Sequence, residues 1–328
     1  MIHPKRVIAL AAAAALTACL ASCAQSSTPS GSSSADGQLE VTEVKGLMIR
    51  ATLSAPFVAA QEEGFAKDQG LTLSYDWADG SAAAVAQLIS GDTDVALSSY
   101  FGVIDAARQG IDVVVVGNIS LNSPKTSSLE TLPDSGITSL KHLEGKTIGV
   151  SDLASIHKIY LEAEMLRKGF DPSTITFVAV PFGDMATSLE LGHIDAGAFQ
   201  GMPLALAKES LGVVTVHDYG VGSVAGMPQA GWIMKRTFVD ANPNTVSALQ
   251  CALAAGTKLM AEDDEAFAQV SLKAELTNEK ALAMTKKSDF NFDLTGLQKN
   301  VDVLVETGAL KKSFDVSSIV IPAPDTCK

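Results

Sequence analysis

Two stretches of the chain, about a hundred residues apart, share one pattern of apolar and polar positions. Leu88-Ile-Ser-Gly-Asp-Thr-Asp-Val-Ala96 is matched by Leu189-Glu-Leu-Gly-His-Ile-Asp-Ala-Gly197. In each stretch the pattern predicts a helix that ends at glycine and is followed by a buried strand. Apolar runs extend the match on both sides, at 71–75 and 175–180 before it and at 113–116 and 213–216 after it. The repeat predicts two similar lobes with a cleft between them.

Short strands and helices alternate through both halves of the chain. In the first half we expect strands at 47–53, 71–77, 95–98 and 113–116, and helices at 57–67, 81–89 and 100–108. In the second half we expect strands at 146–150, 174–180, 196–199 and 213–217, and helices at 156–168, 184–191 and 203–210. The polar, turn-rich stretch 120–145 is interpreted as the passage between lobes. A strand at 230–235 is expected to lead back, and helices at 243–260, 264–276, 280–286 and 294–306 to complete the first lobe.

This alternation is typical of parallel sheets with right-handed crossovers. The predicted fold class is therefore α/β and two-lobed, each lobe a mainly parallel sheet flanked by helices, with a two-strand hinge that restricts motion to closing of the cleft. We expect residues 45–120 plus 229–328 to form lobe 1 and residues 121–228 to form lobe 2.

The N-terminus has the features of a targeting segment. Lys5-Arg6 precede an apolar run, Val7–Leu16, that is too short to span a bilayer. The tetrapeptides that end at Cys19 and Cys23 both resemble bacterial lipoprotein signals. Cys23 is preferred as the lipidation site because it follows the longer apolar region and precedes a polar tract; Cys19, or an ordinary secretory signal, is the alternative.

We accordingly expect residues 1–22 to be a lipoprotein signal peptide and residues 23–44 to be a flexible tether rich in serine, glycine and proline. The protein is then extracytoplasmic, lipid-anchored to the outer face of the cell membrane.

The bulk composition excludes several classes of function. A formal net charge of −13 disfavours binding to nucleic acid or to anionic lipid headgroups. No spacing of His, Cys and Asp indicates a metal site, and no G-x-S-x-G elbow is present. Gly220–Gly226 matches a dinucleotide fingerprint only superficially, because no helical pattern follows it. We expect no cofactor, no catalytic residue and a monomer.

Two cysteines remain in the predicted mature domain, Cys251 and Cys327. Outside the cell an even pair is usually a disulfide. On a helix that begins at Asn242-Pro243, Cys251 lies opposite the apolar stripe. The stripe consists of Val246, Leu249, Leu253, Gly256 and Met260. A disulfide that fixes the C-terminal tail is predicted, with two unpaired thiols as the alternative.

In open parallel sheets, ligands bind beyond the carboxyl ends of the strands, where helix N-termini converge. Small residues and hydroxyls in those turns suit a small anion or polar group, which backbone N–H groups would bind. The predicted ligand-binding residues are Ser54, Ser81, Ser98, Ser99, Tyr100 and Asn118 in the first lobe, and Ser151, Ala154, Ser155, Phe182 and Gln200 in the second. Each hydroxyl has the alternative role of a helix cap.

The stretch Ser54-Ala-Pro-Phe-Val-Ala-Ala-Gln-Glu-Glu-Gly-Phe-Ala-Lys-Asp-Gln-Gly-Leu71 resembles the opening of ABC-transporter substrate-binding proteins of the nitrate/sulfonate/taurine class. The two Leu-x-x-Gly-x-x-Asp stretches, Leu143–Val150 and Asn242-Pro243 also fit that family. The resemblance implies a type II periplasmic-binding-protein fold and a lipid-anchored receptor that delivers a small-molecule solute to ABC permease subunits.

The chain departs from that family at one point. Many relatives carry Trp-x-x-Glu-Pro where this chain has Ala198-Phe-Gln-Gly-Met-Pro203, so an acidic ligand contact is missing. A sulfonate, nitrate, carboxylate or neutral solute is therefore favoured over a taurine-like amine. Two alternatives stay open: a protein of the same fold that binds or makes thiamine pyrimidine precursors, and a lipoprotein that senses a ligand without feeding a permease.

Overall fold

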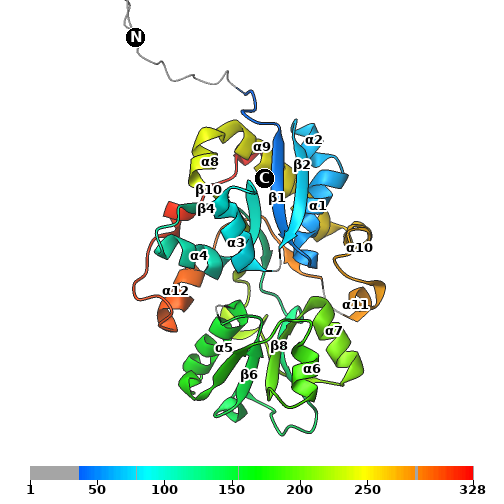
Figure 1. The fold of residues 1–328 in the computed structure, drawn as a ribbon, viewed down its shortest axis with the longest axis vertical. Helices are drawn as coiled ribbons and strands as arrows, with labels where there is room; N and C mark the ends of the chain where they lie inside the picture. The colour runs from blue at the N-terminus through cyan, green and yellow to red at the C-terminus, as the bar shows by residue number, and fades with distance from the viewer. Residues whose placement is uncertain (1–36, 79, 154, 285–286, 328) are drawn as a thin grey trace, which may run out of the picture. The chain divides into compact units, whose positions relative to one another are not determined.

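The computed structural model describes residues 37–78, 80–153, 155–284 and 287–327 (Figure 1). The predicted signal peptide, Cys23, the tether as far as residue 36, and Ala154 lie outside the described residues. The helices and strands within 37–327 belong to one compact unit. They form two sheets, and we call each sheet with its flanking helices a lobe.

Lobe 1 contains a six-stranded sheet of order β11-β4-β10-β3-β1-β2. Its strands are β1 (Glu43–Ile49), β2 (Thr72–Ala78), β3 (Val95–Ser99), β4 (Val113–Leu121), β10 (Pro228–Lys235) and β11 (Asp289–Phe290). β1 pairs in parallel with both β2 and β3, whereas β10 runs antiparallel to β3 and β4. The sheet is therefore mixed, and the strand that returns from lobe 2 lies near its middle.

Lobe 2 contains a five-stranded sheet of order β7-β6-β8-β5-β9. Its strands are β5 (Ser127–Thr131), β6 (Thr147–Val150), β7 (Thr176–Ala179), β8 (Ala196–Gln200) and β9 (Val214–Asp218). β6 pairs in parallel with β7 and β8, and β5 is antiparallel to β8 and β9. In both lobes the first strand after a crossing is thus inserted antiparallel among parallel strands.

The stretch 120–145, interpreted as the passage between the lobes, contains β5, which was not among the expected strands. All five of its residues are buried, although four of them are polar. Glu130 is fully buried and accepts a hydrogen bond from Thr215 Oγ1 (2.7 Å) and from Ser128 Oγ, while the Lys208 ammonium lies 3.7 Å from it. Because its inward side chains are polar and bond to one another, β5 lacks the apolar alternation that marks a buried strand.

The chain crosses between the sheets twice, from β4 to β5 and from β9 to β10. Asn122 ties the two crossings together. Its N–H donates to Met227 O (2.7 Å), its side-chain amide donates to Tyr219 O and Val224 O, and its Oδ1 accepts from Gln229 Nε2 (2.9 Å). The crossings approach so closely that a Cβ at Gly220 would meet the carbonyl of Ser123 at 2.0 Å. The hinge is therefore one hydrogen-bonded unit of two chain segments.

Helices cover the sheets as the alternating pattern predicts (Figure 1). Lobe 1 contains α1 (Ala55–Glu62), α2 (Phe65–Asp68), α3 (Ser81–Ser90), α4 (Tyr100–Arg108), α8 (Arg236–Ala241), α9 (Pro243–Glu262), α10 (Asp264–Lys273), α11 (Glu279–Met284) and α12 (Gln298–Glu306). Lobe 2 contains α5 (Ile156–Arg167), α6 (Met185–Glu190) and α7 (Gly201–Ser210). The helix expected at 57–67 is divided into α1 and α2, because Gly64 adopts φ +83° between them.

The repeated Leu-x-x-Gly-x-x-Asp stretches have the same structure in both lobes. Asp94 donates its N–H to Lys45 O (2.9 Å) and accepts from Lys45 N (2.8 Å) at its carboxylate. Asp195 makes the same two bonds with Thr147, both 2.8 Å long. Asp94 therefore attaches the loop before β3 to the neighbouring strand β1, and Asp195 attaches the loop before β8 to Thr147 of the neighbouring strand β6.

A disulfide joins Cys251 and Cys327, as predicted from the compartment and the helix pattern. Cys251 is half-buried on α9, and the predicted apolar stripe on the opposite side of α9 is buried. Gln250 Nε2 also holds the tail, donating to Ile321 O (3.0 Å). At the start of α9, the Glu40 carboxylate accepts from Asn244 N (3.2 Å) and Thr245 N (2.9 Å), so part of the predicted tether contacts lobe 1. The predicted domain boundaries themselves stay predictions.

Candidate functional site

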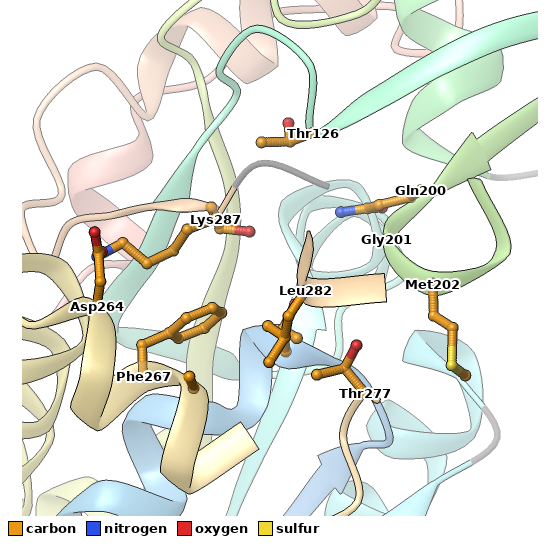
Figure 2. A pocket seen from close by; sticks show the side chains of 12 residues that line it. Thr126, Gln200, Gly201, Met202, Asp264, Phe267, Thr277, Leu282 and Lys287 are labelled. Carbon is orange, nitrogen blue, oxygen red and sulfur yellow. The ribbon is translucent and has the colours of Figure 1, made fainter. Parts of the chain in front are cut away.

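A cavity of about 290 Å³ lies between elements of the two lobes (Figure 2). Lobe 1 contributes Thr52 after β1, three residues of α10, and four later residues: Thr277, Leu282, Lys287 and Ser288. Lobe 2 contributes Thr126 before β5, Gln200 at the end of β8, and the first residues of α7. The cavity thus lies beyond the carboxyl ends of β1 and β8, where sheets of this kind bind ligands.

The cavity wall combines hydroxyl and amide groups with apolar side chains. Its polar uncharged members are Thr52, Thr126, Gln200, Thr277 and Ser288, and its apolar side chains are Met202, Phe267, Ala268 and Leu282. Two lining residues are charged, Asp264 and Lys287, and they form an ion pair with each other. A few polar groups in an apolar wall are typical of small-molecule sites, because the polar groups orient the ligand while apolar contact supplies affinity.

Among the described residues, two ion pairs join the lobes. Arg167 Nε of α5 donates to Glu306 Oε1 of α12 (2.8 Å), and Lys280 of α11 pairs with Glu209 of α7. The second pair lies on the same two helices that contribute Leu282 and Met202 to the cavity wall. Contacts between the lobes therefore continue up to the cavity.

Gln200 is the one described residue of the predicted ligand set that lines this cavity. Four others are fully buried: Ser54, Ser98, Tyr100 and Asn118. Ser54 Oγ donates to Ile49 O (2.6 Å), and Tyr100 OH donates to Asn118 Oδ1 (2.9 Å). In this arrangement these four side chains are buried inside the protein, and the hydroxyls of Ser54 and Tyr100 donate hydrogen bonds to groups of the protein itself.

The remaining predicted residues lie in turns. Ser99 and Ser155 cap α4 and α5 by accepting from Gly102 N (3.3 Å) and Lys158 N (3.4 Å), and Ser81 Oγ accepts from Ser99 N (3.1 Å). Ser151 and Phe182 are half-buried at strand ends of lobe 2. Contact of any of these residues with a solute stays a prediction.

Beside the hinge, lobe 2 contains a ring cluster that we define as His157, Phe182, His217 and Tyr219. The His157 ring lies 5.0 Å from Tyr219 and 6.1 Å from Phe182, and the His217 ring lies 5.4 Å from Tyr219, between centroids. Burial lowers the pKa of His157 to about 4, lowers the pKa of His217, and raises the pKa of the Tyr219 hydroxyl. Neither nitrogen of His157 has a hydrogen-bond partner among the described residues. The cluster is therefore uncharged at neutral pH.

Sequence reasoning missed most of the cavity wall. Thr277, Leu282, Lys287 and Ser288 belong to the late helical region that was assigned only to completing lobe 1. They follow no strand of the repeated unit, so the strand-end rule does not find them. Over the described ranges, no helix has the length and apolar character of a membrane span, and no group of three or more His, Cys, Asp or Glu side chains is placed to bind a metal.

Comparison with known proteins identifies the family. The family model described as NMT1/THI5 like matches residues 51–266. The taurine-binding periplasmic protein of Escherichia coli K12 is 26% identical over 191 residues, which cover 58% of this chain and 58% of that protein. The matched region thus spans somewhat more than half of the relative's length.

Solved structures confirm the fold. The alkanesulfonate-binding protein SsuA of Xanthomonas axonopodis pv. citri, bound to MOPS, superposes with a TM-score of 0.72 at 16% identity over 87% of this chain and 99% of that one. The periplasmic nitrate-binding protein NrtA of Synechocystis PCC 6803 gives a TM-score of 0.67 at 15% identity, covering 86% of each chain. The predicted two-lobed binding-protein fold is confirmed, and the chain belongs to the NMT1/THI5-like family.

Proposed function

We propose that the protein is the extracytoplasmic solute-binding receptor of an ABC importer, which captures a small organic anion or polar solute as its lobes close. The observation that carries the proposal is the cavity whose wall both lobes supply. A solute there contacts lobe 1 and lobe 2 together, so binding favours the closed arrangement. The two crossings tied by Asn122 suit a hinge.

The named relatives support this role. They are taurine-, sulfonate- and nitrate-binding proteins, and two of them are described as periplasmic. All three bind solutes rather than transform them, which favours a receptor over the pyrimidine-related alternative. The receptor acts as a monomer anchored through Cys23 at the outer face of the cell membrane, and it passes its solute to permease subunits.

A thermal-shift screen tests the proposal. The panel contains alkyl and aryl sulfonates, nitrate, taurine, aromatic acids and pyrimidine precursors. A solute at a concentration of 100 Kd is expected to stabilise the protein by about 2.7 kcal/mol. The control is the same panel with Gly201→Trp, which places a large side chain on the cavity wall. Because Gly201 adopts φ +58°, where a side chain strains the backbone, the melting curve of the solute-free variant checks that it is folded. Absence of any shift with the wild-type protein contradicts the proposed solute class, and turnover of a panel member contradicts a pure receptor.

A further inference from the structure

Lys287 and Asp264 form an ion pair on the lobe 1 wall of the cavity (Figure 2). They are the charged members of the lining among the described residues. We propose that Lys287 binds the anionic group of the solute and that the solute anion displaces the Asp264 carboxylate to reach it. This inference rests on the proposed solute-binding function and names the residue that selects the solute's charge.

The Lys287 ammonium is held in place independently of Asp264. Its Nζ donates to Ala261 O (2.9 Å), in the last turn of α9, and lies 5.7 Å from the centre of the Phe267 ring. Carbonyl groups at a helix C-terminus and the face of an aromatic ring both attract a cation. The Lys287 side chain is only 21% exposed. Removing the carboxylate therefore leaves a positioned cation in the wall.

Asp264 differs from Lys287 in that its side chain is 89% exposed. It lies in the first turn of α10, where the helix dipole stabilises a negative charge. When it rotates away from Lys287, water and this helix end still solvate its carboxylate. Because the Asp264 carboxylate is exposed, water competes with Lys287 for it, which limits the net free energy of the pair. The carboxylate is therefore a partner that a better-placed anion can replace.

The surrounding wall restricts the chemical class of anionic solute that fits the cavity. Phe267 lies beside the Lys287 ammonium, Leu282 supplies further apolar wall, and Gln200 lies across the cavity from Lys287 and Asp264 (Figure 2). A solute with one sulfonate or carboxylate and a short apolar group meets both kinds of surface. An uncharged analogue of the same shape gains the apolar contact but not the contact with the ammonium.

The test is isothermal titration of ethanesulfonate and of uncharged dimethyl sulfone into wild-type protein and three variants. Lys287→Met is expected to weaken ethanesulfonate binding by at least about tenfold, since a charge-assisted bond is lost. Asp264→Asn is expected to tighten ethanesulfonate binding by about twofold to tenfold, because its competitor is neutralised. Lys287→Arg keeps the charge and is expected to retain most of the affinity.

The matched control is Lys273→Met. Lys273 lies on α10 like Asp264 and pairs with Glu62 at 2.8 Å within lobe 1, but it does not line the cavity. This variant is expected to bind ethanesulfonate within about twofold of wild type, since its pair is exposed. Thermal unfolding of every variant checks that it is folded.

Two outcomes overturn the assignment of Lys287 and leave solute capture intact: unchanged ethanesulfonate affinity in Lys287→Met, or a wild-type protein that binds dimethyl sulfone as tightly as ethanesulfonate. Weaker binding in Asp264→Asn overturns the displacement step. A wild-type protein that binds no member of the screening panel contradicts the proposed function, and this inference with it.

Discussion

The two lobes begin from the same repeated unit and diverge where β3 and β8 end. Ser99-Tyr100 and Gln200-Gly201 occupy corresponding positions, 101 residues apart, like Asp94 and Asp195. In lobe 1, Ser99 caps α4, and the fully buried Tyr100 donates to Asn118. In lobe 2, Gln200 faces the cavity, and a Cβ placed on Gly201 would have no atom within 4 Å. One copy of the unit fills its strand end with its own side chains, whereas the other leaves its strand end open to the cavity.

The lobes also differ in their titratable groups. Four of the five histidines lie between residues 142 and 217, and the fifth is His3. Lobe 2 therefore contains both buried histidines of the ring cluster, and within the described residues lobe 1 contains no histidine. As the pH falls from 6.5 towards 4, protonation of these buried histidines should therefore destabilise lobe 2 and not lobe 1.

The largest expected effect is acid destabilisation of lobe 2. Because burial lowers the pKa of His157 from 6.5 to about 4, the unfolded chain binds more protons than the folded chain between those values. The contribution is fully present above pH 6.5 and is lost as the pH falls towards 4; the full shift corresponds to about 3 kcal/mol. Hydrogen exchange at pH 7.5 and pH 5 should show amides of β6–β9 losing protection before those of β1–β3.

His157→Phe should remove much of this pH dependence, and His142→Phe, at an exposed position, should leave it unchanged. Equal loss of protection in both lobes at pH 5 would show that the ring cluster is not its source.

The next effect tests whether the repeated aspartates are equivalent. Asp94→Ala and Asp195→Ala each leave a backbone N–H, of Lys45 or Thr147, without its acceptor. Each substitution is expected to lower the free energy of unfolding by about 2 kcal/mol, because the lost bond had a charged acceptor. Urea unfolding measures the loss, and the Asn variants, which keep an acceptor oxygen, serve as controls. If only one of the two substitutions lowers the free energy of unfolding, the two lobes share the geometry of the repeat but not its contribution to stability.

The smallest expected effect distinguishes the end of β3 in lobe 1 from the end of β8 in lobe 2. Ser99→Ala removes a helix cap and should cost about 1 kcal/mol of stability without changing ethanesulfonate affinity. Gln200→Ala should do the reverse, weakening ethanesulfonate binding by about 1 kcal/mol at unchanged stability, since its amide faces the cavity. Melting curves and titrations on the same samples distinguish the two. If Ser99→Ala weakens binding as strongly as Gln200→Ala, the filled strand end of lobe 1 also contributes to the site.

Local sequence patterns predicted most of the helices and strands, the repeat, the two-lobed α/β fold and the disulfide. They succeeded because each strand of the unit alternates with a helix that ends at a glycine, as at Gly91 and Gly192. They did not predict β5, whose buried side chains are polar, and they missed α8 and β11. They also placed the first strand at 47–53, whereas β1 spans Glu43–Ile49. Gln200 was found because a strand-end rule is local, whereas Lys287 and Asp264 meet only through the packing of α9 and α10. A site wall contributed by distant segments has no local signature.

The hydrogen bonds of Glu40 and the disulfide of Cys327 place both ends of the described chain beside the first half of α9. The last turn of that helix supplies Ala261 to the Lys287 ammonium. A helix of 20 residues is about 30 Å long. At 1.5 Å per residue, Ala261 lies about 24 Å along α9 from Thr245 and about 15 Å from Cys251. A fluorophore or sensor-chip linkage attached beside Glu40 or Cys327 therefore starts at least about 15 Å along the helix from Ala261, which suits the protein to immobilised biosensor formats.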